Sequence, residues 1–233
     1  MKIIWENATE TISATNSESG FPASNMLNEH SKKRWKSGVS STTVTATLQG
    51  GSNALAMYNL TADSVTVTVD GIDYNFTLLQ DDGWGEYRLK SFFLDYGTVA
   101  GTHDATIELN ISGDDVACGI FFSGVAYSWT NPRWGANTGA KSHSIVYDLD
   151  NGFEYIFQRN LSKTPSLSMQ PESKEEYFNF MRWAEAIYPD PFLLYIENFS
   201  EELTYYARME SLPKGLLSSF NNYKIDFSLK EFL

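Results

Sequence analysis

Cysteine is almost missing from this chain, because Cys118 is the only one in 233 residues. A single cysteine cannot close a disulfide within the chain and cannot supply a multi-cysteine metal site. Its neighbours in Ala117-Cys118-Gly119-Ile120-Phe121-Phe122 are typical of an apolar strand. We therefore expect Cys118 to be a buried, inert thiol that behaves as a small hydrophobic residue.

Positive charge is also scarce. The chain has 17 basic and 29 acidic residues, which gives a formal net charge of −12. Binding to nucleic acid depends on clustered Lys and Arg that contact phosphates. The densest basic run, Lys32-Lys33-Arg34 with Lys36, is too short to supply such a surface. We expect no nucleic-acid partner.

Long apolar runs are absent from the sequence. No stretch reaches the length of a transmembrane helix, and Met1-Lys2-Ile3-Ile4-Trp5-Glu6 lacks the apolar core of a signal peptide. We therefore expect synthesis in a host cytoplasm and no insertion into a membrane.

Signals of catalysis and of cofactor binding are weak. His30, His103 and His143 lie far apart, and none has a ligand residue at the spacing of a transition-metal site. No G-x-S-x-G nucleophile elbow or Gly-rich phosphate loop occurs. Asp81-Asp82 and Asp114-Asp115 offer oxygen ligands for calcium, but their spacing favours solvated acidic turns. We expect no catalytic residue, no metal and no cofactor; a glycosidase, which needs two placed carboxylates, is the weakest alternative.

Aromatic residues are what the chain has in abundance, at 15% of its length, and they favour β-strands. The clearest local pattern runs through Val65, Val67 and Val69, turns at Asp70-Gly71, and continues with alternating apolar residues to Leu78. Two period-2 runs joined by Asp-Gly predict a hairpin with a type I′ turn. About seven or eight strands are expected by residue 125, which is the spacing of a sandwich. The segment 6–20 shows no period and is predicted to be a loop, and 86–94 is predicted to be one strand.

The predicted fold class is mostly β, with a jelly-roll β-sandwich first and a β-rich α+β domain with one main helix after it. The expected domains are residues 1–126 and 143–233, joined by a linker at 127–142 that is rich in Pro, Gly and Asn. Ser173 and Glu176 predict a helix near 173–187 through a capping box, and an apolar face follows them. Strands are expected at 144–149, at 153–159 and in the apolar run that begins at Phe192.

Tryptophans near turns are the candidate binding residues. Trp84, Trp129 and Trp134 lie in or beside turn-rich segments, where an aromatic ring can stack on the apolar face of a sugar. The competing interpretation, which we favour, is that they cover the core or lie in a protein interface, because Trp is rarely left fully exposed.

Two segments of the first half carry a family resemblance. They are Glu18-Ser19-Gly20-Phe21-Pro22-Ala23-Ser24-Asn25-Met26-Leu27-Asn28 and Lys33-Arg34-Trp35-Lys36-Ser37. Together they resemble the opening of a discoidin domain of the coagulation factor 5/8 C type. Cys118–Gly124 is similar to the late strand of that family, so the resemblance covers roughly residues 1–125. It implies a jelly roll with Trp35 closing one end. The cysteine pair of the secreted members is missing, which removes their extracellular lipid-binding function.

The layout of the second half is similar to the β-rich C-terminal part of phage tail-tip proteins. The resemblance implies a structural virion protein of a bacteriophage tail or baseplate, located in the virion. Its partners would be copies of itself and other tail proteins. The alternative is a carbohydrate-binding module that recognises a glycan on the host surface.

Overall fold

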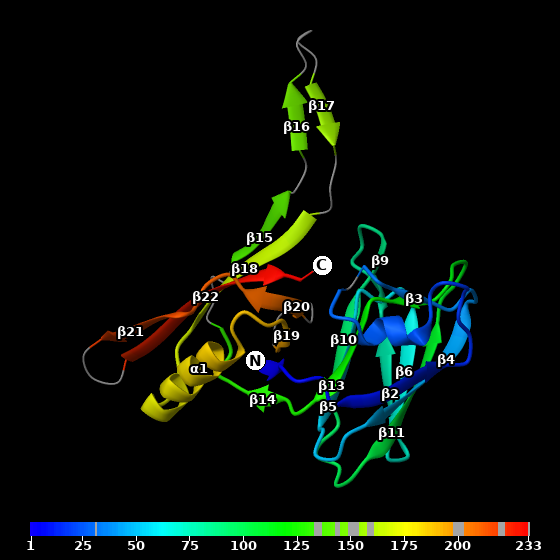
Figure 1. Ribbon diagram of the computed structural model, residues 1–233, viewed down its shortest axis with the longest axis horizontal. Coiled ribbons are helices and arrows are strands. Elements are labelled where there is room, and N and C mark those ends of the chain that lie inside the picture. The colour runs from blue at the N-terminus through cyan, green and yellow to red at the C-terminus, as the bar shows by residue number, and fades with distance from the viewer. Residues whose placement is uncertain are drawn as a thin grey trace. The chain divides into compact units, whose positions relative to one another are not determined.

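The chain forms two units, and β-strands dominate both. The computed structural model describes residues 1–30, 32–132, 137–142, 145–148, 154–157, 161–197, 203–218 and 222–232. One unit comprises Met1–Ser128 with Phe192–Tyr206, and the other comprises Trp129–Pro191 with Ala207–Leu233. The predicted mostly-β class with a single main helix is confirmed (Figure 1). None of the described helices is long and apolar enough to cross a membrane.

The first unit is built on a sandwich of two antiparallel sheets. The five-stranded sheet has the order β2 (Thr9–Ala14), β4 (Ser41–Leu48), β11 (His103–Asn110), β6 (Ser64–Val69) and β7 (Ile72–Thr77). The three-stranded sheet has the order β10 (Ser91–Asp95), β5 (Ala54–Tyr58) and β13 (Ile120–Gly124). Eight strands in two sheets are the strand number of a jelly roll.

The core lies between the two sheets. Alternate residues of β4 and β6 are buried, as period-2 side-chain direction requires of strands with one covered face. The middle strand of the smaller sheet, β5, is buried at every position. Both sheets supply residues to one apolar cluster, among them Val44, Val67, Met57 and Phe121.

The hairpin predicted at Asp70-Gly71 is confirmed. β6 and β7 pair from Ser64↔Thr77 to Val69↔Ile72, which leaves Asp70 and Gly71 as the two turn residues. Their φ angles are 51° and 76°, so both lie in the left-handed region that a type I′ turn requires.

The first unit contains further short elements outside the two sheets of the sandwich. They are the 3-10 helix η1 (Ala23–Leu27) and the strands β1 (Lys2–Ile4), β3 (Trp35–Lys36), β8 (Leu79–Asp81), β9 (Glu86–Arg88), β12 (Ala117–Cys118), β14 (Tyr127–Ser128) and β19 (Phe192–Ile196). Trp35, in β3, is fully buried, and its Nε1 donates hydrogen bonds to the Asn16 carbonyl at 3.2 Å and the Ser17 hydroxyl at 3.1 Å. Trp35 thus joins the core and holds the segment before η1.

Two predictions within the first unit are wrong. The segment 6–20 is not only loop, because it contains β2, which pairs with β4 at the edge of its sheet. An edge strand that is largely exposed needs no apolar alternation, so its sequence gives no strand signal. The single strand expected over 86–94 is two strands, β9 and β10, which belong to different sheets.

The second unit joins a sheet to the one α-helix. Its elements are β15 (Asn137–Ser142), β16 (Ile145–Asp148), β17 (Glu154–Phe157), β18 (Leu161–Met169), α1 (Lys174–Ile187), β21 (Lys214–Ser218) and β22 (Asn222–Glu231). β18 pairs with β15 and β22, and β21 pairs with β22. On α1, Phe180 packs on Phe227 of β22 with ring centroids 5.3 Å apart.

The predicted helix start is confirmed, and the Glu176 carboxylate bonds to residues that lie outside the helix. The Ser173 hydroxyl accepts a hydrogen bond from the Glu176 backbone N–H at 3.0 Å, which caps α1. The Glu176 carboxylate accepts from the backbone N–H groups of Thr130 and Glu172, each at 2.7 Å. Glu176 therefore ties the segment before β15 to the first turn of the helix.

The predicted domain limits differ from the units in two places. The expected linker at 127–142 contains β14 and β15. Phe192–Ile196, expected in the second domain, pairs with β1 and belongs to the first unit. The first unit ends at Tyr206, within the strand β20 (Leu203–Met209). The backbone thus returns to the sheet beside β1, a long-range pairing that local composition does not reveal.

Replacing Trp35 by Ala should lower the free energy of unfolding by about 3–5 kcal/mol, because it leaves a cavity and removes a hydrogen-bond donor. Urea unfolding followed by circular dichroism measures the change. Trp84→Ala is the matched control, since Trp84 is 96% exposed; it should shift stability by less than about 0.5 kcal/mol. Equal losses in the two variants would contradict the assigned core position of Trp35.

Candidate functional site

The hairpin formed by β8 and β9 in the first unit presents the most exposed aromatic side chain of the described residues. Trp84, in the turn between the two strands, is 96% exposed. The strands pair as Leu79↔Arg88 and Asp81↔Glu86, so the turn spans residues 82–85. A tryptophan that serves packing is largely buried. Trp84 is therefore the predicted aromatic that is best placed to meet a ligand or partner.

Two aspartates fix the conformation of this turn. The Asp81 carboxylate accepts from the Gly83 N–H at 2.9 Å, and the Asp82 carboxylate accepts from the Trp84 N–H at 2.8 Å. Such side-chain bonds to the backbone two residues on are the Asx turns that Asp favours. Gly83 has a φ of +83°, a conformation that side-chain-bearing residues rarely adopt. Trp84 is thus held at a turn of defined shape.

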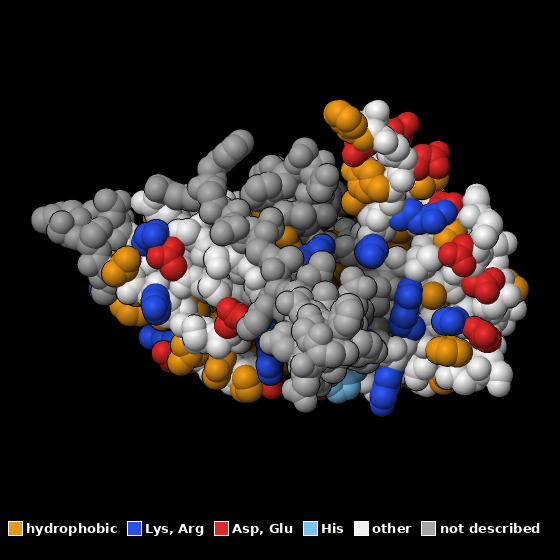
Figure 2. Space-filling model, turned by 90° about the horizontal axis from the view of Figure 1, so that it is seen from above, with side chains coloured by type: hydrophobic (Ala, Val, Ile, Leu, Met, Phe, Trp, Pro, Cys, Tyr) orange, Lys and Arg blue, Asp and Glu red, His pale blue; other side chains and the backbone are white. Residues whose placement is uncertain are grey.

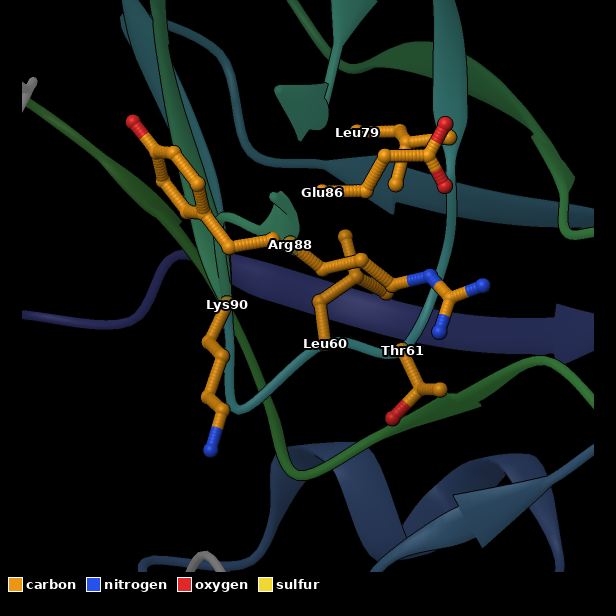
Figure 3. A pocket seen from close by; sticks show the side chains of 7 residues that line it. Leu60, Thr61, Leu79, Glu86, Arg88 and Lys90 are labelled. Atoms are coloured by element: carbon orange, nitrogen blue, oxygen red, sulfur yellow. The ribbon is translucent and has the colours of Figure 1, made fainter. Parts of the chain in front are cut away.

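Beside this hairpin lies a pocket of about 470 Å³. It is lined by Leu60, Thr61, Leu79, Glu86, Tyr87, Arg88 and Lys90. Figure 3 shows Leu79 and Glu86 on one side, Leu60 and Thr61 on the other, and the Arg88 side chain extending between them. Leu60 is buried, while the charged groups are exposed. The lining therefore combines apolar surface with donors and acceptors, as small-ligand sites do.

Asp63 fixes the base of the hairpin. Its carboxylate accepts from Arg88 Nε and from the Ser112 N–H, the latter at 2.7 Å. The Asp63 carbonyl accepts from the N–H groups of Leu78 and Leu79 at 2.8 and 3.0 Å. The hydrogen bond from Arg88, together with that from Ser112, lowers the pKa of Asp63 from its usual 3.8 against the opposing effect of burial. The charge of Arg88 is accordingly offset within the site.

The other two candidate tryptophans differ from Trp84. Trp129 is half-buried in the second unit, where its ring meets Phe180 edge-on at 5.2 Å and lies 6.2 Å from Trp183. These contacts assign Trp129 to packing against α1. Trp134 lies outside the described residues.

The residues of the pocket were missed from the sequence because they come from separate segments. Leu60 and Thr61 follow β5, whereas Glu86, Arg88 and Lys90 come more than twenty residues later. The one local signal was Asp81-Asp82-Gly83-Trp84-Gly85, which places a large aromatic among turn residues.

The other groups with potential chemistry are the Cys118 thiol and any clusters of metal-ligating side chains. Cys118 is fully buried, and burial raises the pKa of its thiol to about 12. Its Sγ donates to the Ile120 carbonyl at 3.3 Å. Within the described ranges no three His, Cys, Asp or Glu side chains are grouped closely enough to hold a metal ion. On the face drawn in Figure 2, Lys and Arg side chains lie among Asp and Glu side chains.

Comparison with protein-family models and with curated proteins finds no match for this chain. Its function has to be inferred from its own residues and geometry.

Asp63→Asn should lower the free energy of unfolding at neutral pH by about 1 kcal/mol, because a charge-assisted but partly exposed hydrogen bond is weakened. Since the folded-state pKa of Asp63 lies below 3.8, its stabilisation is present above that value and is lost as pH falls through the folded-state pKa. The difference in free energy of unfolding between Asp63→Asn and wild type should therefore become smaller in acid, as measured by urea unfolding at several pH values. Asp104→Asn, which alters an exposed carboxylate bonded to Thr47, is the control. A difference in free energy of unfolding that is constant with pH would contradict the stabilisation assigned to the Asp63 carboxylate.

The Cys118 thiol should not react with a thiol-specific dye in the native protein at neutral pH, because its burial and its raised pKa suppress the thiolate. After unfolding in urea, one equivalent of dye should react. Fast labelling without denaturant would show that Cys118 is accessible and would contradict its core position.

Proposed function

We propose that this chain is a structural, non-catalytic protein of a bacteriophage tail or baseplate that assembles with copies of itself and with other tail proteins. The proposal rests on the resemblance of residues 18–37 and 118–124 to a discoidin-like jelly roll and on the tail-tip-like layout of the second half. One structural observation, in the second unit, favours assembly over an isolated binding domain.

That observation is a β-ribbon formed by β16 and β17. Among the described residues these two strands pair only with each other, in the register Ile145↔Phe157 to Asp148↔Glu154. Every ribbon position except Asp148 and Glu154 is Ile, Val, Tyr or Phe.

A two-stranded hairpin is at best marginally stable in water, and three or more strands or a packing partner are needed for independent stability. A two-stranded ribbon so rich in apolar and aromatic residues is therefore stabilised most when another chain adds a strand to it. In a particle built from repeated copies, identical contacts of this kind close into rings by cyclic symmetry. The ribbon thus supports an assembly function.

A second candidate function, recognition of a host-surface carbohydrate, is favoured by the exposure of Trp84 and by the pocket beside its hairpin. The two functions are compatible, because the ribbon belongs to the second unit and Trp84 to the first.

The ribbon predicts how self-association responds to mutation. The double variant Tyr147→Asp with Tyr155→Asp introduces charge at two positions that face each other in register. We expect the wild-type chain to form a discrete oligomer in light scattering coupled to size exclusion, and the variant to dissociate at least ten-fold more readily, since each 1.4 kcal/mol is a factor of about ten.

Ile72→Asp is the matched control, because Ile72 is a 56% exposed apolar residue at the tip of another hairpin. It should leave the oligomer unchanged. Mass spectrometry of purified tail particles should detect the chain. A wild-type chain that stays monomeric at high concentration and is missing from such particles would refute the proposed function.

A further inference from the structure

We propose that the pocket lined by Leu60, Leu79, Glu86, Arg88 and Lys90, together with the ring of Trp84, is a binding site for uncharged hexopyranose sugars. This inference deepens the carbohydrate-recognition function and rests on it. It specifies the site and the class of sugar that the site accepts.

The first step concerns Trp84. Covering a large apolar side chain is favourable, a gain that the exposed Trp84 ring does not realise in the described structure. The hydrogen bonds from Gly83 and Trp84 to Asp81 and Asp82 hold the turn, so less conformational entropy is lost when a ligand binds. A flat aromatic ring on a turn whose backbone is held in this way suits the apolar C–H face of a pyranose.

The second step concerns the pocket itself. Leu60 and Leu79 supply apolar surface, whereas Thr61, Tyr87 and Lys90 supply groups that donate hydrogen bonds. The Glu86 carboxylate accepts them. A sugar ring presents the same combination, because its hydroxyl groups both donate and accept while its C–H groups are apolar. The volume of about 470 Å³ lies in the range of small-molecule pockets.

The third step concerns charge, which decides the class of sugar. Asp81, Asp82 and Glu86 are exposed carboxylates on the same hairpin as Trp84. Of the two cations in the lining, Arg88 is already paired with Asp63. Arg34 lies beside the lining, where its Nη2 donates to Thr61 Oγ1 at 2.8 Å, so Lys90 and Arg34 together balance two of the three carboxylates. The local charge is therefore negative.

A negative site repels sialic acids, uronic acids, sugar phosphates and anionic lipid headgroups, since bringing like charges together is costly. Carboxylates instead accept strong, charge-assisted hydrogen bonds from neutral hydroxyl groups. The same argument disfavours a phosphate ligand or an acidic membrane surface, although Trp84 is apolar.

The test is a glycan array probed with the full chain, followed by calorimetry with the best neutral glycan. The array should carry glucose-, galactose-, mannose- and N-acetylhexosamine-terminated glycans beside sialylated and uronic-acid glycans. We expect binding among the neutral glycans, and Trp84→Ala should weaken it about ten-fold or more. Ile72→Ala, which truncates an exposed apolar side chain on a different hairpin of the same unit, should have no effect.

A charge variant gives a readout that loss of folding cannot imitate. Glu86→Gln keeps the size of the side chain and removes one negative charge, so it should raise the binding of acidic glycans relative to neutral ones. Stability of each variant is checked by urea unfolding.

Three outcomes would overturn the inference in different ways. Neutral binding that survives Trp84→Ala would place the sugar elsewhere on the chain. Stronger binding to acidic glycans, or to vesicles of phosphatidylserine in phosphatidylcholine, would contradict the charge argument. No binding to any glycan would refute carbohydrate recognition as a whole, whereas the assembly function depends on the separate oligomer and particle measurements.

Discussion

The apolar layer between the two sheets of the sandwich is the constraint on which the first unit depends. Each sheet can bury its inward side chains only against the other, so the period-2 pattern of β4 and β6 must face β5 and β13. A shift of one residue in β4 or β6 would turn buried valines to solvent and threonines inward. Once this register is set, the positions of the loops that leave the strands are set as well.

The candidate site is a consequence of that register. Asp63 stands at the start of β6 and meets Arg88 of the β8–β9 hairpin and the Ser112 N–H just after β11. One carboxylate therefore joins three segments that are separate in the sequence. Because the base of the hairpin is fixed in this way, Trp84 at its turn can stay exposed without the hairpin collapsing onto the sheet. Rigid support below an exposed aromatic ring is what a binding surface requires.

The second unit follows a different principle. Aromatic residues of α1 pack on its sheet, as Phe180 does on Phe227. Trp129 also contacts Phe180. Among the described residues, the strands β16 and β17 pair only with each other. Tryptophans that look equivalent in the sequence thus have different functions, since one completes an apolar cluster and another stands at a solvated turn.

Elements whose signals are local could be predicted from the sequence. Alternation, turn chemistry or capping within a few residues predicts the Asp70-Gly71 hairpin, the buried strand Ala54–Tyr58, the buried Cys118 and the start of α1 at Ser173. Long-range contacts, by contrast, make β2 a strand and pair Phe192–Ile196 with β1. They also bring Asp63, Arg88 and Leu60 together in one site. Edge strands carry little apolar pattern, and long-range pairs leave no trace in local composition. Their geometry exists only once the core has fixed the register of the strands around it.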